Sequence, residues 1–255
     1  MLIFFIIIIA LILVLGILFF MVKPSKSRTS DFWKTKLFAH RGISNEIAPE
    51  NSIAAFKNAA DNGYGIELDV RLTRDSVPVV FHDRTLLRLC GDKRKISEVT
   101  TKELENLSLL GTSEGIPLLS EVVSLFPNTP LICEIKTDSL HSNSVCYPVA
   151  QILRKRSAPT AVQSFNPFAL RIIKKLSPDL LRGQLAGREK NPVAFLLRSQ
   201  LLNFISRPDF VSHNINSRSS LFLHVCRKLF GLRLILWGAK ESTDTNNADG
   251  VIFGD

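Results

Sequence analysis

From residue 37 to the end of the sequence, short runs of β-forming residues alternate with segments of helical pattern. The runs are Leu37–Arg41, Gly65–Leu72, Leu131–Lys136, Ala161–Phe165, Leu181–Leu185, Asp209–Ser212, Leu232–Trp237 and Gly250–Phe253. Strands that alternate with helices predict a parallel sheet, and eight of them are the number that closes a (β/α)8 TIM barrel. The 255 residues are enough for one such α/β domain.

The connections between these runs predict where the helices and an insertion lie. Asn51 or Ser52 is a suitable N-cap for a helix that follows the first run, and further helices are expected over 167–176 and 193–205. The second run is followed by a turn and a short returning strand over 77–82. Residues 83–130 are too long for a simple connection, so we expect a small insertion over the barrel mouth.

The first 22 residues predict a membrane anchor. Leu2 to Val22 is a run of 21 uncharged, mostly apolar residues, and about 20 such residues span a bilayer as a helix. A cleaved signal peptide would have a basic start, a shorter apolar run and a small-residue cleavage site, none of which is present. We therefore expect a retained single-pass helix, with residues 2–22 in the bilayer.

A polar, basic linker is expected over residues 23–35, followed by the barrel domain over 36–255. Lys23, Lys26 and Arg28 directly follow the apolar run, and no Lys or Arg precedes it. Because basic flanks stay on the cytoplasmic side, the barrel is predicted to be cytoplasmic.

Composition excludes some classes of partner and site. The net charge of +9 could indicate nucleic-acid binding, but the basic residues are scattered and form no known nucleic-acid-binding motif, so no such partner is expected. A basic surface suits an anionic lipid leaflet or an anionic phosphodiester better. The four cysteines, Cys90, Cys133, Cys146 and Cys226, lack C-x-x-C spacing, which predicts free thiols rather than a zinc site or a disulfide scaffold.

Ionisable residues stand at several strand ends, where active groups of a barrel lie. Glu67 and Asp69 are two residues apart in one strand and so share a face, and Glu134 lies in the next barrel strand. Buried carboxylates are costly unless they are paired or bind a metal. An all-oxygen cluster of this kind suits Mg²⁺ or Ca²⁺; a structural ion-pair network with Arg71 or Lys136 is the alternative.

Four more residues complete the predicted site. His40 and His82 are candidates for general acid and base, because imidazole titrates near neutral pH. Arg41 and Lys136 are suited to hold phosphate oxygens, Arg by bidentate contact and Lys as a point charge. The remaining histidines are assigned structural positions; they are His141, His213 and His224.

These residues fall within stretches that resemble the glycerophosphodiester phosphodiesterase family. The stretches are AHRG (39–42), PENS-x3-F (49–56), ELDVRLTRD (67–75), PVVFHD (78–83), IPLLSEV (116–122), EIK (134–136), QSFNPFAL (163–170) and RGQL (182–185). Their combination and order make the resemblance specific from residue 37 to 185, with a weaker match to the end. It implies a TIM-barrel hydrolase in which Glu67, Asp69 and Glu134 bind a divalent cation, His40 and His82 are catalytic, and Arg41 and Lys136 contact phosphate.

The resemblance also implies the reaction. Relatives cleave glycerophosphodiesters to sn-glycerol 3-phosphate and an alcohol, and some act on lysophospholipids. A lysophospholipase D, a cyclising phospholipase-type phosphodiesterase and an inactive, membrane-tethered lipid- or phosphate-binding module are the alternatives. Two departures lie near the end: Trp237-Gly238-Ala239 replaces the usual W-T-V, and Gly254-Asp255 follows the eighth run where a barrel normally has a closing helix, which leaves barrel closure open.

Overall fold

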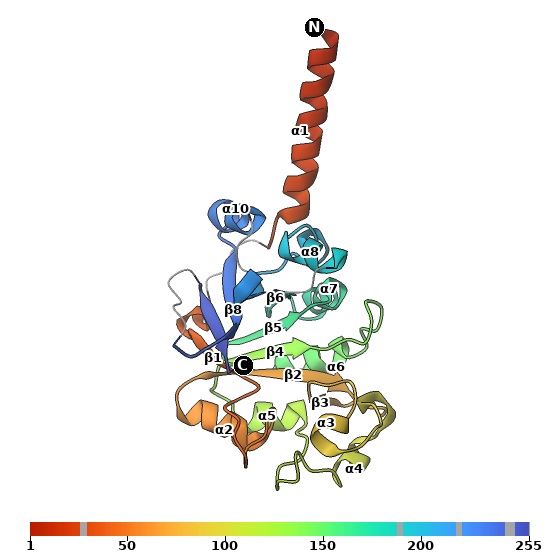
Figure 1. Cartoon of the computed structure of the whole chain (residues 1–255), viewed down its shortest axis with the longest axis vertical. Helices are drawn as coiled ribbons and strands as arrows, with labels where there is room; N and C mark the ends of the chain where they lie inside the picture. The colour runs from red at the N-terminus through yellow and green to blue at the C-terminus, as the bar shows by residue number, and fades with distance from the viewer. Residues whose placement is uncertain (26–29, 188–190, 218–220, 243–247, 255) are drawn as a thin grey trace.

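The computed structural model describes residues 1–25, 30–187, 191–217, 221–242 and 248–254. Within these residues, eight parallel strands form a closed barrel, in which β9 pairs with both β8 and β1 (Figure 1). The barrel strands are β1 (Leu37–His40), β2 (Gly65–Leu72), β4 (Leu131–Ile135), β5 (Thr160–Ser164), β6 (Leu181–Ala186), β7 (Phe210–Asn214), β8 (Arg233–Ala239) and β9 (Gly250–Phe253). The predicted TIM barrel is confirmed, and backbone pairing of β9 with β1 answers the question of its closure.

Helices pack around the outside of the barrel and bury its outward-facing apolar side chains. They are α2 (Ile53–Asp61), α5 (Leu119–Leu125), α6 (Cys146–Leu153), α7 (Pro167–Leu176), α8 (Pro192–Arg198), α9 (Asn203–Ser206) and α10 (Leu221–Phe230). Ser52 is the N-cap of α2, because its hydroxyl accepts from the amide of Ala55. Asn166 and Asn191 cap α7 and α8, each followed by a proline at the first helical position.

The helical segment expected over 193–205 is divided into two helices, α8 and α9. Gln200 lies between them with a φ of 64°, a left-handed conformation that ends the first helix. Its side-chain amide donates to the carbonyls of Leu197 and Arg198 and so satisfies part of the end of α8.

The excursion after β2 folds back as predicted. β3 (Pro78–Val80) pairs antiparallel with β2, and α3 (Leu87–Cys90), the 3-10 turn η2 (Ile96–Glu98) and α4 (Thr101–Leu104) follow it. Residues including Phe81, Leu86 and Leu104 give this insertion a small core of its own. Helix α5, at the end of the segment predicted as insertion, returns to the barrel and leads into β4.

The barrel interior at the amino ends of the strands is filled by aromatic rings. Phe32, from the 3-10 turn η1 (Asp31–Lys34), stacks on Phe38 of β1, and Phe210 of β7 lies beside it. Gly65 and Gly183 leave room for these rings, since a Cβ there would lie 2.4 Å from Phe38 and 2.2 Å from Phe210. Residues preceding β1 therefore form part of the barrel floor.

Helix α1 (Leu2–Val22) projects away from the barrel (Figure 1). Among the described residues it is the one helix long and apolar enough to cross a membrane, by its length and composition. Its 21 residues correspond to about 31 Å, close to the thickness of a bilayer core.

A short 3-10 turn, η3 (Ile215–Ser217), follows β7. The four cysteines are free thiols, as predicted, and three of them are buried.

Gly183→Ala should destabilise the fold, because the added methyl group overlaps the Phe210 ring. We expect a loss of about 1–3 kcal/mol in the free energy of unfolding, measured by thermal or urea unfolding. Gly250→Ala is the matched control in another barrel strand, where the nearest atom to a new Cβ is 3.5 Å away. Equal stability of the two variants would contradict this account of the barrel floor.

Candidate active site

The polar residues predicted from the sequence meet at the carboxyl ends of β1, β2 and β4. Strand register places His40 beside Glu67 and Asp69 beside Glu134. A cavity of about 280 Å³ is lined by His40, Arg41, Glu67, His82, Glu134 and Lys136, together with Gln163, Phe165, Leu185, Trp237 and Ile252. Asp69 lies behind this lining and is fully buried. The structure thus brings all seven predicted site residues together.

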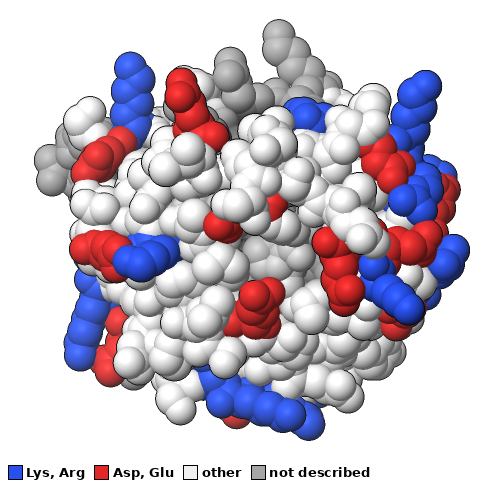
Figure 2. All heavy atoms as spheres, turned by 90° about the horizontal axis from the view of Figure 1, so that it is seen from below, with Lys and Arg blue, Asp and Glu red and all other residues white. Residues whose placement is uncertain are grey.

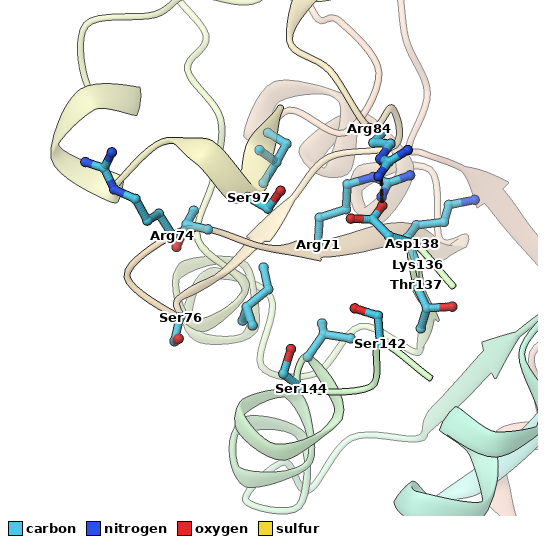
Figure 3. A pocket seen from close by; sticks show the side chains of 14 residues that line it. Arg71, Arg74, Ser76, Arg84, Ser97, Lys136, Thr137, Asp138, Ser142 and Ser144 are labelled. Carbon is cyan, nitrogen blue, oxygen red and sulfur yellow. Dashed lines mark hydrogen bonds and ion pairs between the residues drawn. The ribbon is translucent and has the colours of Figure 1, made fainter. Parts of the chain in front are cut away.

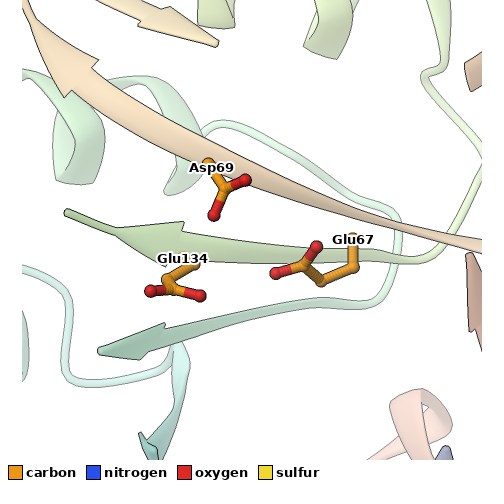
Figure 4. A group of neighbouring side chains, drawn as sticks. All are labelled: Glu67, Asp69 and Glu134. Carbon is orange, nitrogen blue, oxygen red and sulfur yellow. The ribbon is translucent and has the colours of Figure 1, made fainter. Parts of the chain in front are cut away.

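Two carboxylates, Glu67 and Glu134, line the cavity, and a third, Asp69, lies directly behind them. One oxygen from each of Glu67, Asp69 and Glu134 lies within 4.8 Å of the others, and all three side chains are buried. Figure 4 shows their carboxyl groups converging from β2 and β4. Such a set offers oxygen ligands from three directions, which is the donor set that Mg²⁺ and Ca²⁺ prefer.

The electrostatics of Glu67 support a cation site. Burial, together with the charges of Asp69 and Glu134, raises the pKa of Glu67 to about 7. Arg41 N–H and Gln163 Nε2 donate to its two oxygens at 3.3 and 3.1 Å. A divalent cation would relieve the repulsion that otherwise favours a proton on this carboxyl group, so these residues fit a metal.

Asp69 is held in its charged form by its neighbours. Burial alone would raise its pKa, but Lys136 and Arg41 hold the pKa well below its ordinary value. Lys136 Nζ lies 3.0 Å from Asp69 and 2.6 Å from Glu134, and Arg41 Nε lies 3.1 Å from Asp69. Asn51 donates to Asp69 Oδ2 at 3.0 Å. Two positively charged side chains, Arg41 and Lys136, thus lie among the three carboxylates.

The conformation of the turn after β1 accounts for the Arg41-Gly42 pair of the AHRG stretch. Arg41 has a φ of 58°, which turns the chain so that its amide faces Glu67. Gly42 follows with a φ of 82°, and a Cβ on it would lie 2.6 Å from the backbone of Ala55. Only glycine fits this close approach between the turn and α2.

A chain of ion pairs connects the carboxylate cluster to His82. Arg41 bridges Asp69 and Glu50, and Arg88 bridges Glu50 and Asp83. Asp83 Oδ1 lies 2.7 Å from His82 Nδ1. A carboxylate can only accept, so Nδ1 carries the proton and Nε2 is left for proton transfer. Burial lowers the pKa of His82, which favours the neutral imidazole.

A second polar pocket of about 270 Å³ adjoins the first through Lys136 (Figure 3). Arg71 and Arg84 both reach Asp138 there, at 3.2 and 3.3 Å. Arg71 Nε also donates to the backbone carbonyl of His82 at 2.7 Å. Arg71 therefore fixes the backbone of His82, while Asp83 orients its ring.

The opposite wall of the active cavity is apolar. Phe165, at the end of β5, packs edge-to-face on Trp237 of β8, with 6.3 Å between ring centroids. A further groove of about 590 Å³ begins at Phe165 and passes Leu140, Val193 and Leu197. One side of the site is thus charged and the other side can contact apolar parts of a substrate.

Sequence reasoning missed the residues that position the predicted ones. They are Glu50, Asn51, Asp83, Arg88 and Gln163. The sequence indicates only a helix cap for Asn51, but its φ of 59° aims its amide at Asp69. Asp83 directly follows His82, and this adjacency was the one available signal. The histidines assigned to structural positions lie outside this cavity; His213, for example, bonds to Gln200.

Comparison with known proteins gives one consistent family. The sequence profile described as "Glycerophosphoryl diester phosphodiesterase family" matches residues 40–249. A glycerophosphodiester phosphodiesterase from Caldanaerobacter subterraneus is 37% identical over 166 residues, which are 60% of this chain and 67% of that protein.

Solved structures agree with the fold. A glycerophosphodiester phosphodiesterase from Thermotoga maritima superposes with a TM-score of 0.67 and 26% identity, over 86% of this chain and 94% of that one. An Oleispira antarctica phosphodiesterase in complex with the product sn-glycerol-3-phosphate gives a TM-score of 0.68 at 24% identity, over 86% and 92% of the two chains.

Removal of one carboxylate should weaken cation binding. Replacement of residues that merely support metal ligands costs about 10–100-fold in affinity, so Glu67→Gln should lose at least tenfold for Mg²⁺ or Ca²⁺, measured by isothermal titration calorimetry. Glu121→Gln, an exposed carboxylate on α5, is the control and should bind like the parent. Unchanged affinity in Glu67→Gln would exclude this cluster as the metal site.

Proposed function

The chain belongs to the glycerophosphoryl diester phosphodiesterase family, and from this membership we propose that it hydrolyses glycerophosphodiesters to sn-glycerol 3-phosphate and an alcohol. The observation that carries the proposal is the convergence of three buried carboxylates, two histidines, Arg41 and Lys136 on one cavity. These are the groups that metal-assisted cleavage of a phosphodiester requires: ligands for a cation, proton-transfer groups and counter-charges for phosphate.

Glu67, Asp69 and Glu134 would hold the divalent cation, Mg²⁺ or Ca²⁺. When bound, such an ion supplies a Lewis acid that polarises a phosphoryl oxygen. Arg41 and Lys136 lie at the same cavity and would offset the negative charge that develops on phosphate in the transition state. Both already neutralise Asp69, so they are placed to serve the ligands and the phosphate together.

His40 and His82 would transfer the protons. His40 is at the end of β1 beside Glu67, and His82 lines the same cavity beyond β3. One would take a proton from the attacking water or hydroxyl group, and the other would give one to the leaving oxygen. Asp83 keeps the Nε2 of His82 free for this transfer.

The apolar groove favours lysophospholipids as a second candidate substrate class. It begins at Phe165, which also lines the active cavity, and continues along Val193 and Leu197. An acyl chain could lie there while its phosphate occupies the cavity. Cleavage of the same bond, between phosphorus and the head-group oxygen, would then release lysophosphatidate and the head-group alcohol, as in a lysophospholipase D.

We further propose that residues 1–22 anchor the enzyme, residues 23–35 connect the anchor and residues 36–255 form the catalytic domain on the cytoplasmic side. The apolar length of α1 and the Lys and Arg that directly follow it in the sequence support this topology. Phe32 of the connecting segment packs into the barrel floor, so that segment belongs partly to the barrel.

Either histidine variant should abolish most turnover. A general acid or base contributes about 10²–10⁴ in rate, so His40→Ala and His82→Ala should each reduce hydrolysis by at least that much. The full chain in detergent is assayed for glycerol 3-phosphate release from glycerophosphocholine, with Mg²⁺, Ca²⁺ or EDTA. His224→Ala, on α10, is the matched control.

The products distinguish the candidates. Release of glycerol 3-phosphate that EDTA abolishes supports the proposal, whereas choline with lysophosphatidate from lysophosphatidylcholine indicates lysophospholipase D. A cyclic phosphate means intramolecular attack. Near-normal turnover by His40→Ala or His82→Ala would refute the assigned roles, and a folded protein inactive on both substrates with either metal would contradict the proposed reaction.

Asp83→Asn should lower kcat by at least about tenfold, because Asp83 fixes the tautomer and ring orientation of His82, as the aspartate of a serine-protease triad does for its histidine. KM should change little, because Asp83 does not line the cavity. Asp92→Asn provides the control: Asp92 pairs with Arg94 on the insertion and has no role in the site. If kcat were unchanged, the orientation of His82 by Asp83 would not matter for catalysis.

A further inference from the structure

The end of α1 is bound tightly to the outside of the barrel. Val22 packs into the hydrophobic core, and its carbonyl accepts from Asn203 Nδ2 of α9 at 2.9 Å. Arg207 Nη1 donates to the carbonyls of Phe20 and Lys23 at 2.7 and 2.5 Å. Arg207 therefore lies where the apolar helix ends, which is the depth of lipid phosphates when α1 spans a bilayer.

Arg207 also lines a groove between α7 and α9. The groove has a volume of about 680 Å³ and is lined by Phe168, Arg171, Lys174, Lys175, Phe204, Ile205 and Arg207. Its described lining thus combines four cationic side chains with three apolar ones and contains no carboxylate. Phe204 contacts Phe20 of α1, so the groove opens directly at the foot of the helix.

Exposed apolar side chains occur on the two helices that flank the foot of α1. Figure 1 shows α8 and α10 on either side of the foot of α1. Phe195 of α8 is 57% exposed, and Leu221 and Leu229 of α10 are 76% and 68% exposed. Apolar side chains beside cationic ones at the end of a membrane span are suited to the interface of a bilayer.

The charge distribution agrees with an anionic surface on this side. Between residues 191 and 240 the sequence contains one acidic residue, Asp209, which is buried against Arg182 at 2.9 Å. The face opposite α1 instead carries acidic and basic side chains interspersed (Figure 2). The segment that contains α8, α9 and α10 is therefore basic and apolar, which suits an anionic leaflet.

We propose that the groove between α7 and α9 binds the phosphate of an anionic phospholipid in the leaflet at the foot of α1, with Phe195, Leu221 and Leu229 in the lipid interface. Arg171, Lys175 and Arg207 contact the phosphate, and Phe204 contacts the lipid beneath it. The inference rests on the proposed anchoring by α1, and it is independent of the reaction at the barrel mouth.

Tryptophan quenching in nanodiscs tests this binding with the full chain. Phe204→Trp reports on the groove, Leu13→Trp on α1 and Leu125→Trp on α5, away from the foot of α1. Each nanodisc is a mixture of phosphatidylglycerol and phosphatidylcholine in which only one of the two lipids is brominated. Quenching of the parent protein is subtracted to correct for Trp33 and Trp237. Phe204→Trp should be quenched more strongly by brominated phosphatidylglycerol, Leu13→Trp by both lipids alike, and Leu125→Trp by neither.

Charge variants identify the binding groups. Arg171→Gln and Lys175→Gln, made in the Phe204→Trp background, should each reduce the preference for phosphatidylglycerol about fivefold. Lys93→Gln and Lys102→Gln, exposed on the insertion, are the matched controls and should leave it unchanged. Hydrolysis of glycerophosphocholine in detergent should be unaffected, which verifies the fold.

Two results would overturn the inference. Equal quenching of Phe204→Trp by the two brominated lipids, or a preference that survives removal of both charges, would exclude a phosphate site in the groove while leaving the anchor intact. Absence of quenching at Leu13→Trp would refute the anchor and the groove together. Neither result bears on the hydrolytic reaction.

Discussion

Repulsion among Glu67, Asp69 and Glu134 is the constraint on which the site depends. Three carboxylates buried within 4.8 Å of one another are stable only where opposite charge surrounds them. Lys136 and Arg41 supply two positive charges against the three carboxylates, and burial together with the charges of Asp69 and Glu134 raises the pKa of Glu67. A divalent cation bound among the three carboxylates would supply further positive charge.

The same constraint explains the loops at the barrel mouth. Arg41 must face Asp69, so the chain turns sharply through Gly42, and Glu50 then pairs with Arg41 on its outer side. Arg88 from the insertion joins Glu50 to Asp83 and so reaches His82. The insertion thus completes the site, because its Asp83 and Arg88 orient the histidine that directly precedes it.

The barrel and its site residues could largely be predicted from the sequence, because period and spacing are local signals. Eight β-rich runs fell on the eight barrel strands, and the E-x-D spacing placed Glu67 and Asp69 on one face. The contacts that could not be predicted join residues that are separated in the sequence, and they depend on the backbone conformation of the turns between them. Asn51 reaches Asp69 through a left-handed turn, and Phe32 reaches the barrel floor from a segment that resembles a polar linker.

Attachment of α1 to the barrel has a consequence for how the enzyme would meet its substrates. A flexible segment of the length of residues 23–35 would let a domain sweep about 20 Å around its anchor. Here Asn203 and Arg207 hold the last turn of the helix, Ser25 bonds to Pro208, and Phe32 is inserted in the barrel. A bilayer that α1 spans would therefore hold the barrel at a constant height and tilt, and a substrate embedded in that bilayer would reach it by lateral diffusion.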